Sequence, residues 1–164
     1  KIYNAAYTPT PYYFLHLINR YTIKNKINLR SYYFIDFGCG TGRLLKFFYQ
    51  KTKQFIGIDI NNKFIKNLKN KYESEFFINA DLRKYIKIIK KIKIKTKKKK
   101  KILYFYEPFE DSLVYNIIKS CLSSDDICII INTKNMKIYN SFNKLYKEVL
   151  GEKSKNILII KSPK

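Results

Sequence analysis

A carboxylate followed by three alternating glycines is the feature of this sequence best suited to ligand chemistry. The stretch reads Asp-Phe-Gly-Cys-Gly-Thr-Gly from Asp36 to Gly42, directly after an apolar and aromatic run at residues 32–35. Glycine has no side chain, so the backbone of such a loop can approach a ligand closely. The carboxylate ahead of the loop suits a positively charged ligand group and would repel a pyrophosphate.

Two nucleotide-binding patterns fit this loop poorly. A phosphate-binding P-loop needs a Lys and then a Ser or Thr after its last glycine, whereas Gly42 is followed by Arg43 and Leu44. A dinucleotide fingerprint needs a third glycine where Arg43 stands, so that helix and strand can pack closely. A reductase that uses NAD(P) is therefore the less favoured alternative.

The elements that must position the loop alternate between strands and helices. Apolar runs predict strands, and apolar residues at helical spacing predict the helices between them. This order predicts an α/β fold: a Rossmann-like, doubly wound, mainly parallel sheet of about six strands with helices on both faces. The predicted strands are 32–37, 54–60, 75–79, 102–106, 127–132 and 156–161, and the predicted helices are 43–50, 61–72, 81–92, 111–122 and 138–150.

The length of 164 residues fits one domain. We expect an N-terminal cap helix region at residues 1–31, in which Thr10 caps a helix that begins at Pro11. We expect a Rossmann-like core at residues 32–164. In such a sheet the ligand lies at the carboxyl ends of the strands, so residues that follow a strand face it.

With the glycine loop placed after the first strand, the sequence resembles the class I S-adenosylmethionine-dependent methyltransferases, as a small bacterial-type member of unassigned substrate. The resemblance implies S-adenosyl-L-methionine as the cofactor. It also implies that the loop backbone of Gly38, Cys39, Gly40 and Gly42 approaches the methionine part of the cofactor, and that Asp36 helps to hold its ammonium group.

Two further acids lie at the intervals that this family uses. Asp59 ends the second strand, seventeen residues after Gly42, and the resemblance implies that it binds the ribose hydroxyls. Asp81 follows the third strand and would contact the adenine amino group. Their neighbours Ile60 and Leu82 belong to the same predicted cofactor site. Each acid has a plainer alternative role as a helix cap.

The fourth strand ends in Glu107, Pro108 and Phe109, where many family members carry Asn or Asp, then proline, then an aromatic facing the transferred methyl. These three residues are the predicted catalytic group. An ionised Glu only accepts hydrogen bonds, so Glu107 suits a cationic amine or a proton-accepting role. We expect Pro108 to hold Glu107 extended and Phe109 to wall the pocket. The alternative is that Glu107 only caps the next helix.

The N-terminal segment from Tyr7 to Tyr12 reads Tyr-Thr-Pro-Thr-Pro-Tyr and is similar to a segment of some small bacterial family members. Tyr7 is therefore included in the predicted cofactor site. The resemblance weakens after Asn132, because only one predicted strand, 156–161, follows there and the core looks C-terminally shortened.

The resemblance implies methyl transfer to an acceptor that the sequence does not identify, with a nitrogen on a protein, an amine or a nucleic acid favoured. A shortened C-terminal region would favour the alternative of a non-catalytic cofactor-binding subunit that supports a catalytic partner.

The net charge of +22 has two open explanations: a coding bias toward AT-rich codons, which would enrich Lys together with Asn, Ile, Tyr and Phe, or selected binding of a polyanion. With either origin, we expect weak, salt-sensitive binding of nucleic acid or acidic surfaces through lysines. The densest lysine run, Lys97 to Lys101, precedes the fourth strand and so belongs to the end of the sheet away from the cofactor. Proteins that bind single strands usually have aromatic residues for base stacking, and none interrupts this run. We therefore expect a solvated loop.

A metal site and a disulfide framework are both disfavoured. The sequence has a single histidine, His16, and three cysteines, Cys39, Cys121 and Cys128, without metal-ligand spacing. Such a chain is expected in a reducing compartment such as the cytoplasm. No apolar run approaches the roughly 20 residues that would span a membrane.

Overall fold

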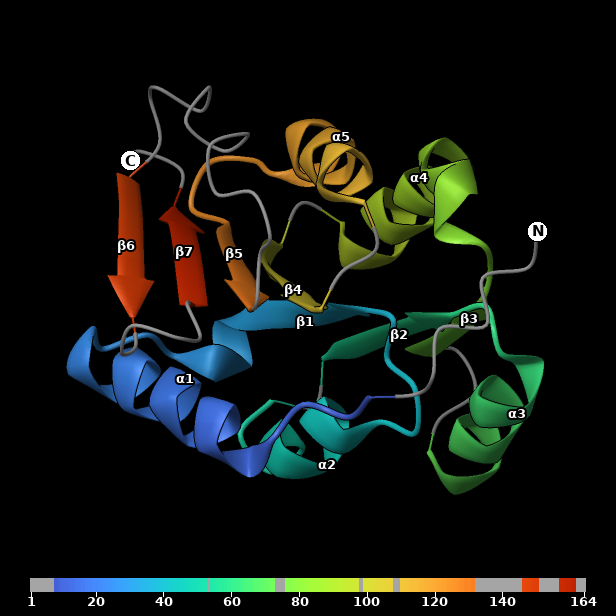
Figure 1. Ribbon diagram of the computed structural model, residues 1–164, viewed down its shortest axis with the longest axis horizontal. Coiled ribbons are helices and arrows are strands. Elements are labelled where there is room, and N and C mark those ends of the chain that lie inside the picture. The colour runs from blue at the N-terminus through green and yellow to red at the C-terminus, as the bar shows by residue number, and fades with distance from the viewer. Residues whose placement is uncertain are drawn as a thin grey trace.

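A seven-stranded sheet in the order β3-β2-β1-β4-β5-β7-β6 organises the protein (Figure 1). The computed structural model describes residues 8–52, 54–72, 76–97, 99–107, 110–131, 146–150 and 157–161. The first five strands pair in parallel, whereas β7 runs antiparallel to both β5 and β6. The predicted α/β, mainly parallel, Rossmann-like fold is therefore confirmed. The strands are β1 Tyr32–Phe37, β2 Phe55–Asp59, β3 Phe77–Asn79, β4 Lys100–Tyr106, β5 Ile127–Ile131, β6 Tyr146–Leu150 and β7 Ile157–Lys161.

Helices cover both faces of the sheet, with α1, α2 and α3 on one side and α4 and α5 on the other (Figure 1). Within the described part of the chain, none of them has the length and apolar character needed to cross a bilayer. The helices are α1 Tyr12–Lys24, α2 Arg43–Phe48, α3 Asn62–Lys71, α4 Tyr85–Thr96 and α5 Asp111–Cys121, with single 3-10 turns η1 Leu29–Ser31 and η3 Leu82–Lys84.

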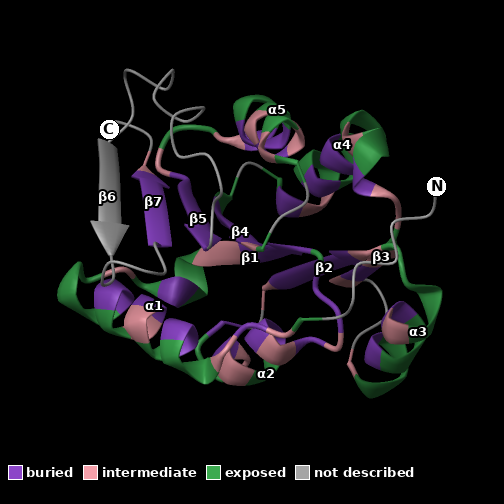
Figure 2. Cartoon of the chain, viewed as in Figure 1, coloured by how far each residue is buried: buried purple, intermediate pink, exposed green. Residues whose placement is uncertain are grey.

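The strands are buried on both faces, which is why they read as continuous apolar runs (Figure 2). Successive side chains of a strand point to opposite faces. In β4, Ile102 and Tyr104 join the apolar layer beneath α1, α2 and α3, whereas Leu103 and Phe105 join the layer beneath α4 and α5. This alternation fixes which residues at the strand ends share a face.

The start of α1 differs from the prediction. Pro11, not Thr10, occupies the capping position, and no side chain caps the helix. The Thr10 hydroxyl is buried and lies 2.8 Å from the hydroxyl of Tyr104 on β4. A long-range bond to the sheet has therefore replaced the local cap.

The predicted helix at residues 138–150 is wrong over its last five residues, because Tyr146–Leu150 forms the edge strand β6. Its ladder with β7 runs from the pair Tyr146 and Lys161 to the pair Leu150 and Ile157. Pairing with an otherwise open edge of the sheet has overridden local helix preference. Two strands therefore follow β5, where one was expected; residues 132–145 and Gly151 lie outside the described residues.

The lysine run is only partly a solvated loop, because β4 begins at Lys100 and Lys101 is 4% exposed. The ammonium of Lys101 lies 2.9 Å from Oδ2 of Asp126, itself 1% exposed by side chain. The same carboxylate accepts hydrogen bonds from the backbone N–H groups of Lys101 and Ser123, at 2.7 Å each. Asp126 thus ties the start of β4 to the turn before β5.

Asp126→Asn should lower the free energy of unfolding by about 3–5 kcal/mol, because it leaves the buried Lys101 ammonium without a counter-charge. The matched control is Asp125→Asn, which removes the half-exposed pair with Lys100 (N···O 3.5 Å) and should cost less than about 1 kcal/mol. Urea unfolding of the two variants measures the difference. Similar losses in both would contradict a structural role for the buried pair.

Candidate cofactor site

The glycine loop lies at the carboxyl end of β1 and is tied to the end of β2. The N–H groups of Gly38 and Cys39 both donate to the carbonyl of Ile58, at 2.8 and 3.0 Å. The N–H of Gly40 donates to Oδ2 of Asp59 at 2.9 Å. The loop backbone is therefore held in one shape by the neighbouring strand before any ligand contacts it.

The first and last glycines of the loop are required for different reasons. Gly38 has a φ of +95°, and a Cβ there would have nothing within 4 Å, so its open side leaves room for a ligand. Gly42 has a φ of +77° and precedes α2, and a Cβ there would lie 2.7 Å from a methyl of Leu68 on α3. Gly42 thus permits α2 and α3 to pack, a role that the sequence did not reveal.

The Cys39 side chain turns away from the open side of the loop. It is 5% exposed, and its sulfur would lie 2.9 Å from a Cβ on Gly57. Burial is the main reason that the pKa of the Cys39 thiol is raised well above its usual value. Cys39 can therefore offer a ligand its backbone but not a thiolate.

Asp36 is the buried acid of the site, at 4% exposure near the end of β1. Burial, and secondarily the charge of Asp59, raises the pKa of Asp36 to about 8. Within the described part of the chain, no N–H or O–H group donates a hydrogen bond to this carboxyl. A cation placed against it would favour the ionised form, which suits the predicted contact with an ammonium.

Asp59 has a second role beyond the predicted ribose contact. Its Oδ2 accepts from Gly40 and its Oδ1 accepts from the N–H of Asn61 at 2.8 Å, so the carboxylate braces both the glycine loop and the turn into α3. Each oxygen retains a lone pair, so ribose binding stays a prediction. Ile60 follows with 57% exposure at the strand end.

Asn79, at the end of β3, was not identified from the sequence. Its amide donates to the carbonyls of Asp59 and Ile60, at 3.1 and 2.9 Å. It therefore holds the carboxyl ends of β2 and β3 together at the predicted ribose and adenine sites. The only sequence feature that could have indicated this role is the position of Asn79, a polar residue at the end of an apolar run.

Asp81 takes the capping role that the sequence left open. Its Oδ1 accepts from the N–H of Arg83 at 3.0 Å, and its carboxylate forms an ion pair with the Arg83 guanidinium. These hydrogen bonds lower the pKa of Asp81. Leu82 beside it is 8% exposed. Adenine binding at Asp81 stays a prediction, and it would share the carboxylate with Arg83.

Glu107 follows β4 and is exposed, but it is not extended as predicted. Its φ is +41°, in the left-handed region, and its N–H donates to the carbonyl of Ile131 at 3.1 Å. This bond to the end of β5 turns the backbone against the preference of a residue that precedes proline. Pro108, Phe109 and the predicted cofactor residue Tyr7 lie outside the described residues.

Arg43, which the sequence offered only as a break in the dinucleotide pattern, clamps the N-terminal segment to the glycine loop. Its Nη1 donates to the carbonyl of Thr10 at 3.2 Å, and its guanidinium lies 5.2 Å from the centre of the Tyr12 ring. Such stacking of Arg on an aromatic adds to the hydrogen bond. The residue after the loop thus positions the segment that precedes α1.

The N-terminal segment also packs on the end of β4. The ring of Phe14 lies 6.3 Å from that of Tyr106, and the Thr10 hydroxyl bonds to Tyr104. Tyr104 pairs with Asp36 across β1 and β4. Burial is the main reason that the pKa of Tyr104 is raised, and the charge of Asp36 adds to it. The segment therefore packs against the strand that neighbours the buried acid.

Comparison with known proteins places this geometry in a family. A family model described as a methyltransferase domain matches residues 29–158. Among curated proteins, no relative of the sequence is found. A candidate type 11 methyltransferase from Sulfolobus solfataricus is similar in structure, with a TM-score of 0.61 at 19% identity, covering 89% of this chain and 92% of that one.

Two further solved structures share the fold. An rRNA methylase from Streptococcus thermophilus has a TM-score of 0.60 at 9% identity, covering 97% of this chain and 100% of its own. A magnesium protoporphyrin IX methyltransferase from Synechocystis, solved with bound S-adenosylmethionine, has a TM-score of 0.59 at 15% identity, covering 92% and 79%.

The fold and the glycine loop define a class I methyltransferase domain. The chain belongs to the methyltransferase family whose model it matches over most of its length. The predicted enzyme class, a methyltransferase, is confirmed. The roles assigned to individual site residues stay predictions.

Asp36 should make stability depend on pH. Its pKa is about 8 in the folded protein and about 4 in an unfolded chain, so the folded protein retains a proton that the unfolded chain releases between these values. The free energy of unfolding contributed by this group is therefore fully present below about pH 4 and is lost as the pH rises to about 8. Between pH 5 and pH 8, the free energy of unfolding measured with urea should fall less in Asp36→Asn than in the parent protein. Identical pH profiles for the two proteins would show that Asp36 is not protonated when folded.

The hydroxyls of Thr10 and Tyr104 should contribute to stability as a coupled pair, so the effects of removing them should not add. Thr10→Val leaves the buried Tyr104 hydroxyl without its partner and should cost about 1–3 kcal/mol of unfolding free energy. Adding Tyr104→Phe removes that hydroxyl too and should recover part of the loss. Additive costs in the complete double-mutant cycle would contradict coupling of the N-terminal segment to β4.

Proposed function

We propose that the protein transfers the methyl group of S-adenosylmethionine to a nitrogen on a protein, an amine or a nucleic acid. The observation that carries this proposal is the register between β1 and β4. Phe37 pairs with Phe105, so the loop that starts at Gly38 and the turn at Glu107 leave the sheet side by side. Glu107 thus provides a carboxylate beside the glycine loop.

The residues present fit the cofactor. Asp36 is a buried carboxyl without a hydrogen-bond donor among the described residues, which suits the cofactor's ammonium. The open side of Gly38 gives the methionine part access to backbone, and Asp59 retains acceptor capacity for ribose hydroxyls. Binding an ammonium against Asp36 would release the carboxyl proton below about pH 8.

When bound, the cofactor supplies a methyl group that its sulfonium makes electrophilic. The protein's part is to hold the acceptor in line with that methyl, which is chiefly a matter of positioning. As the acceptor nitrogen forms its bond to the methyl carbon, the carbon–sulfur bond breaks and the nitrogen must lose a proton. Glu107 is the group that would take this proton.

Tyr106 precedes Glu107 and would help to select the methyl acceptor. Burial raises the pKa of Tyr106, the Glu107 charge raises it further, and the Arg43 charge opposes them. Its hydroxyl therefore stays protonated at neutral pH and can donate a hydrogen bond. With Glu107 as an acceptor beside it, the pair suits a group that carries both a lone pair and an N–H. Pro108, Phe109 and Tyr7 complete the predicted site.

The main reason for considering a non-catalytic partner subunit was a shortened C-terminal region, and the structure does not support that reason. It relied on a core with a single strand after β5, whereas β7 and β6 both extend the sheet there. The proposed role is therefore enzymatic.

The cytoplasm is the location we propose. Cys39, Cys121 and Cys128 are all free and buried. Three thiols of this kind are typical of a reducing compartment.

Glu107→Gln should lower methyl transfer by about 10²–10⁴-fold, the range for loss of a general base. The measurement is incorporation of labelled methyl into cell extract, followed by separation of protein, nucleic acid and small molecules. S-adenosylhomocysteine should raise the melting temperature of parent and variant alike in a saturable way, because only the folded state binds it.

The control for this experiment is Glu110→Gln, an exposed carboxylate at the start of α5, which should label at the parent's rate. Parent-like labelling by Glu107→Gln would remove Glu107 from catalysis. No thermal shift with S-adenosylhomocysteine would remove the cofactor assignment itself.

A further inference from the structure

Cations from three separate segments gather at the amino end of the sheet, opposite the glycine loop. Residues that precede the parallel strands β1, β2 and β4 must lie at this end. Together with Tyr33 near the start of β1, they form a surface that we call the amino-end surface. Its residues are Arg30, Tyr33, Lys51, Gln54, Lys97 and Lys99.

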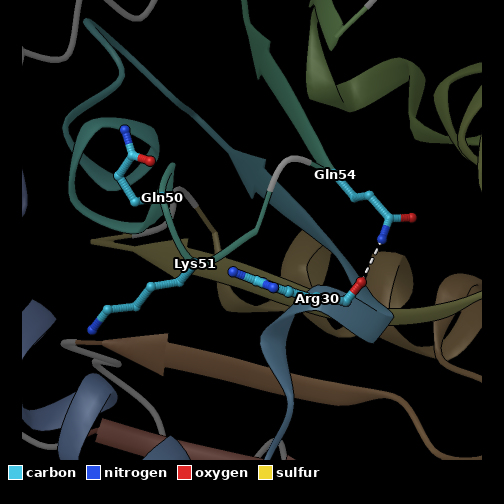
Figure 3. Close-up of a pocket in the computed structure, with 4 residues that line it drawn as sticks. All are labelled: Arg30, Gln50, Lys51 and Gln54. Atoms are coloured by element: carbon cyan, nitrogen blue, oxygen red, sulfur yellow. Dashed lines mark hydrogen bonds between the residues drawn. The ribbon is translucent and has the colours of Figure 1, made fainter.

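The first part of this surface is a shallow hollow of about 360 Å³ lined by Arg30, Gln50, Lys51 and Gln54. Figure 3 shows the Arg30 side chain lying between Lys51 and Gln54, with the Gln54 amide directed at the Arg30 carbonyl. That bond is 2.6 Å long. All four lining side chains carry hydrogen-bond donors and none is an acid, so the hollow suits an anion.

A second hollow of about 430 Å³ continues the surface and is lined by Tyr33, Ile94, Lys95, Thr96, Lys97 and Lys99. Lys99 joins the two, because its ammonium donates to Oε1 of Gln54 at 2.9 Å. The same ammonium lies 5.7 Å from the centre of the Tyr33 ring. A single continuous strip therefore carries guanidinium, ammonium and aromatic groups.

Three cations of this strip have no acidic partner among the described residues. No described carboxylate forms an ion pair with Arg30, Lys97 or Lys99. Two acids of the turn before β5 pair with other lysines, Asp125 with Lys100 and Asp126 with Lys101. Cations left together in this way repel one another, and a polyanion would relieve that repulsion.

We propose that the amino-end surface binds the phosphate backbone of a single-stranded nucleic acid, with a base stacked on Tyr33. The lysine run alone contains no aromatic residue, but folding supplies one from β1. Arg30 offers the fork geometry that suits phosphate oxygens, and Lys99 can leave the Tyr33 ring for a phosphate when a base replaces it. A face of donors with a π-surface favours nucleic acid over an acidic protein.

This binding is separate from the proposed methyl transfer. The glycine loop, Asp59 and Glu107 lie at the carboxyl ends of the strands, whereas the amino-end surface precedes them. Nucleic acid held here would be anchored to the domain without covering the cofactor site. Loss of this binding should therefore leave affinity for S-adenosylhomocysteine unchanged, and the two proposals can fail independently.

The test compares two triple variants with equal loss of charge. Arg30→Gln, Lys97→Gln and Lys99→Gln remove three cations from the surface. The control variant, with Lys46→Gln, Lys66→Gln and Lys87→Gln, removes three exposed cations from α2, α3 and α4. Binding of a fluorescent oligouridylate is measured from about 50 to 200 mM salt.

The surface variant should reduce the slope of log affinity against log salt by about 2, because each phosphate contact on a single strand contributes about 0.7. Its affinity at low salt should fall at least about tenfold, with little change in the control variant. Equal weakening in both variants would overturn the proposal in favour of binding by net charge alone, and unchanged binding in the surface variant would overturn it outright.

Tyr33→Leu tests the stacking contact, since leucine retains apolar packing but has no π-face. Its affinity for the oligouridylate should fall about fivefold or more, with the salt slope unchanged. Tyr33→Phe should restore parent affinity. If poly-glutamate of matched charge bound the parent as tightly as the oligouridylate did, the surface would be assigned to acidic proteins and the nucleic-acid proposal would be overturned.

Discussion

The hydrogen bond from the Gly40 N–H to the Asp59 carboxylate is the interaction on which the site depends. It joins two residues that are 19 positions apart in sequence and fixes the glycine loop against the end of β2. Without it, three glycines would leave that loop with many conformations, since glycine loses more freedom on folding than any other residue. A side chain predicted to bind ribose thus also stabilises the backbone that would contact the rest of the cofactor, so ribose binding and loop shape are physically linked.

Parallel pairing accounts for how distant residues come to share one edge. Because β1, β2, β3 and β4 run in the same direction, the residues that follow them all leave the sheet at its carboxyl end. Asp36 is near the end of the central strand and is buried. Burial is the main cause of its raised pKa. Burial therefore converts an ordinary acid into one whose charge depends on a cationic ligand.

The sequence predicted the features that local pattern determines. Apolar runs located β1 to β5, and the spacing of glycines and acids located the loop, Asp36 and Asp59. What it missed depends on partners far away in the chain: Arg43 reaches Thr10, Lys101 is buried with Asp126, and β6 exists because β7 offers an edge. The conformation of Glu107 belongs to the same class, since a bond to β5 overrode the preference set by Pro108. Local propensity cannot show such contacts, because each is decided only when the sheet has formed.

Charge is divided between the two ends of the sheet, and this division suits each end to a different kind of ligand. Of only 12 acidic residues in a chain with 34 lysines and arginines, Asp36, Asp59 and Glu107 all lie at or beside the carboxyl ends of β1, β2 and β4. A cofactor with a sulfonium and an ammonium is attracted to that end in spite of the net charge of +22. The amino end has the opposite balance, which is the basis of the proposed binding of nucleic acid there. At physiological salt, charges are screened over roughly 8 Å, so opposite ends of a domain interact weakly through solvent. The same excess of lysine can therefore promote binding of nucleic acid at one end without repelling the cofactor from the other.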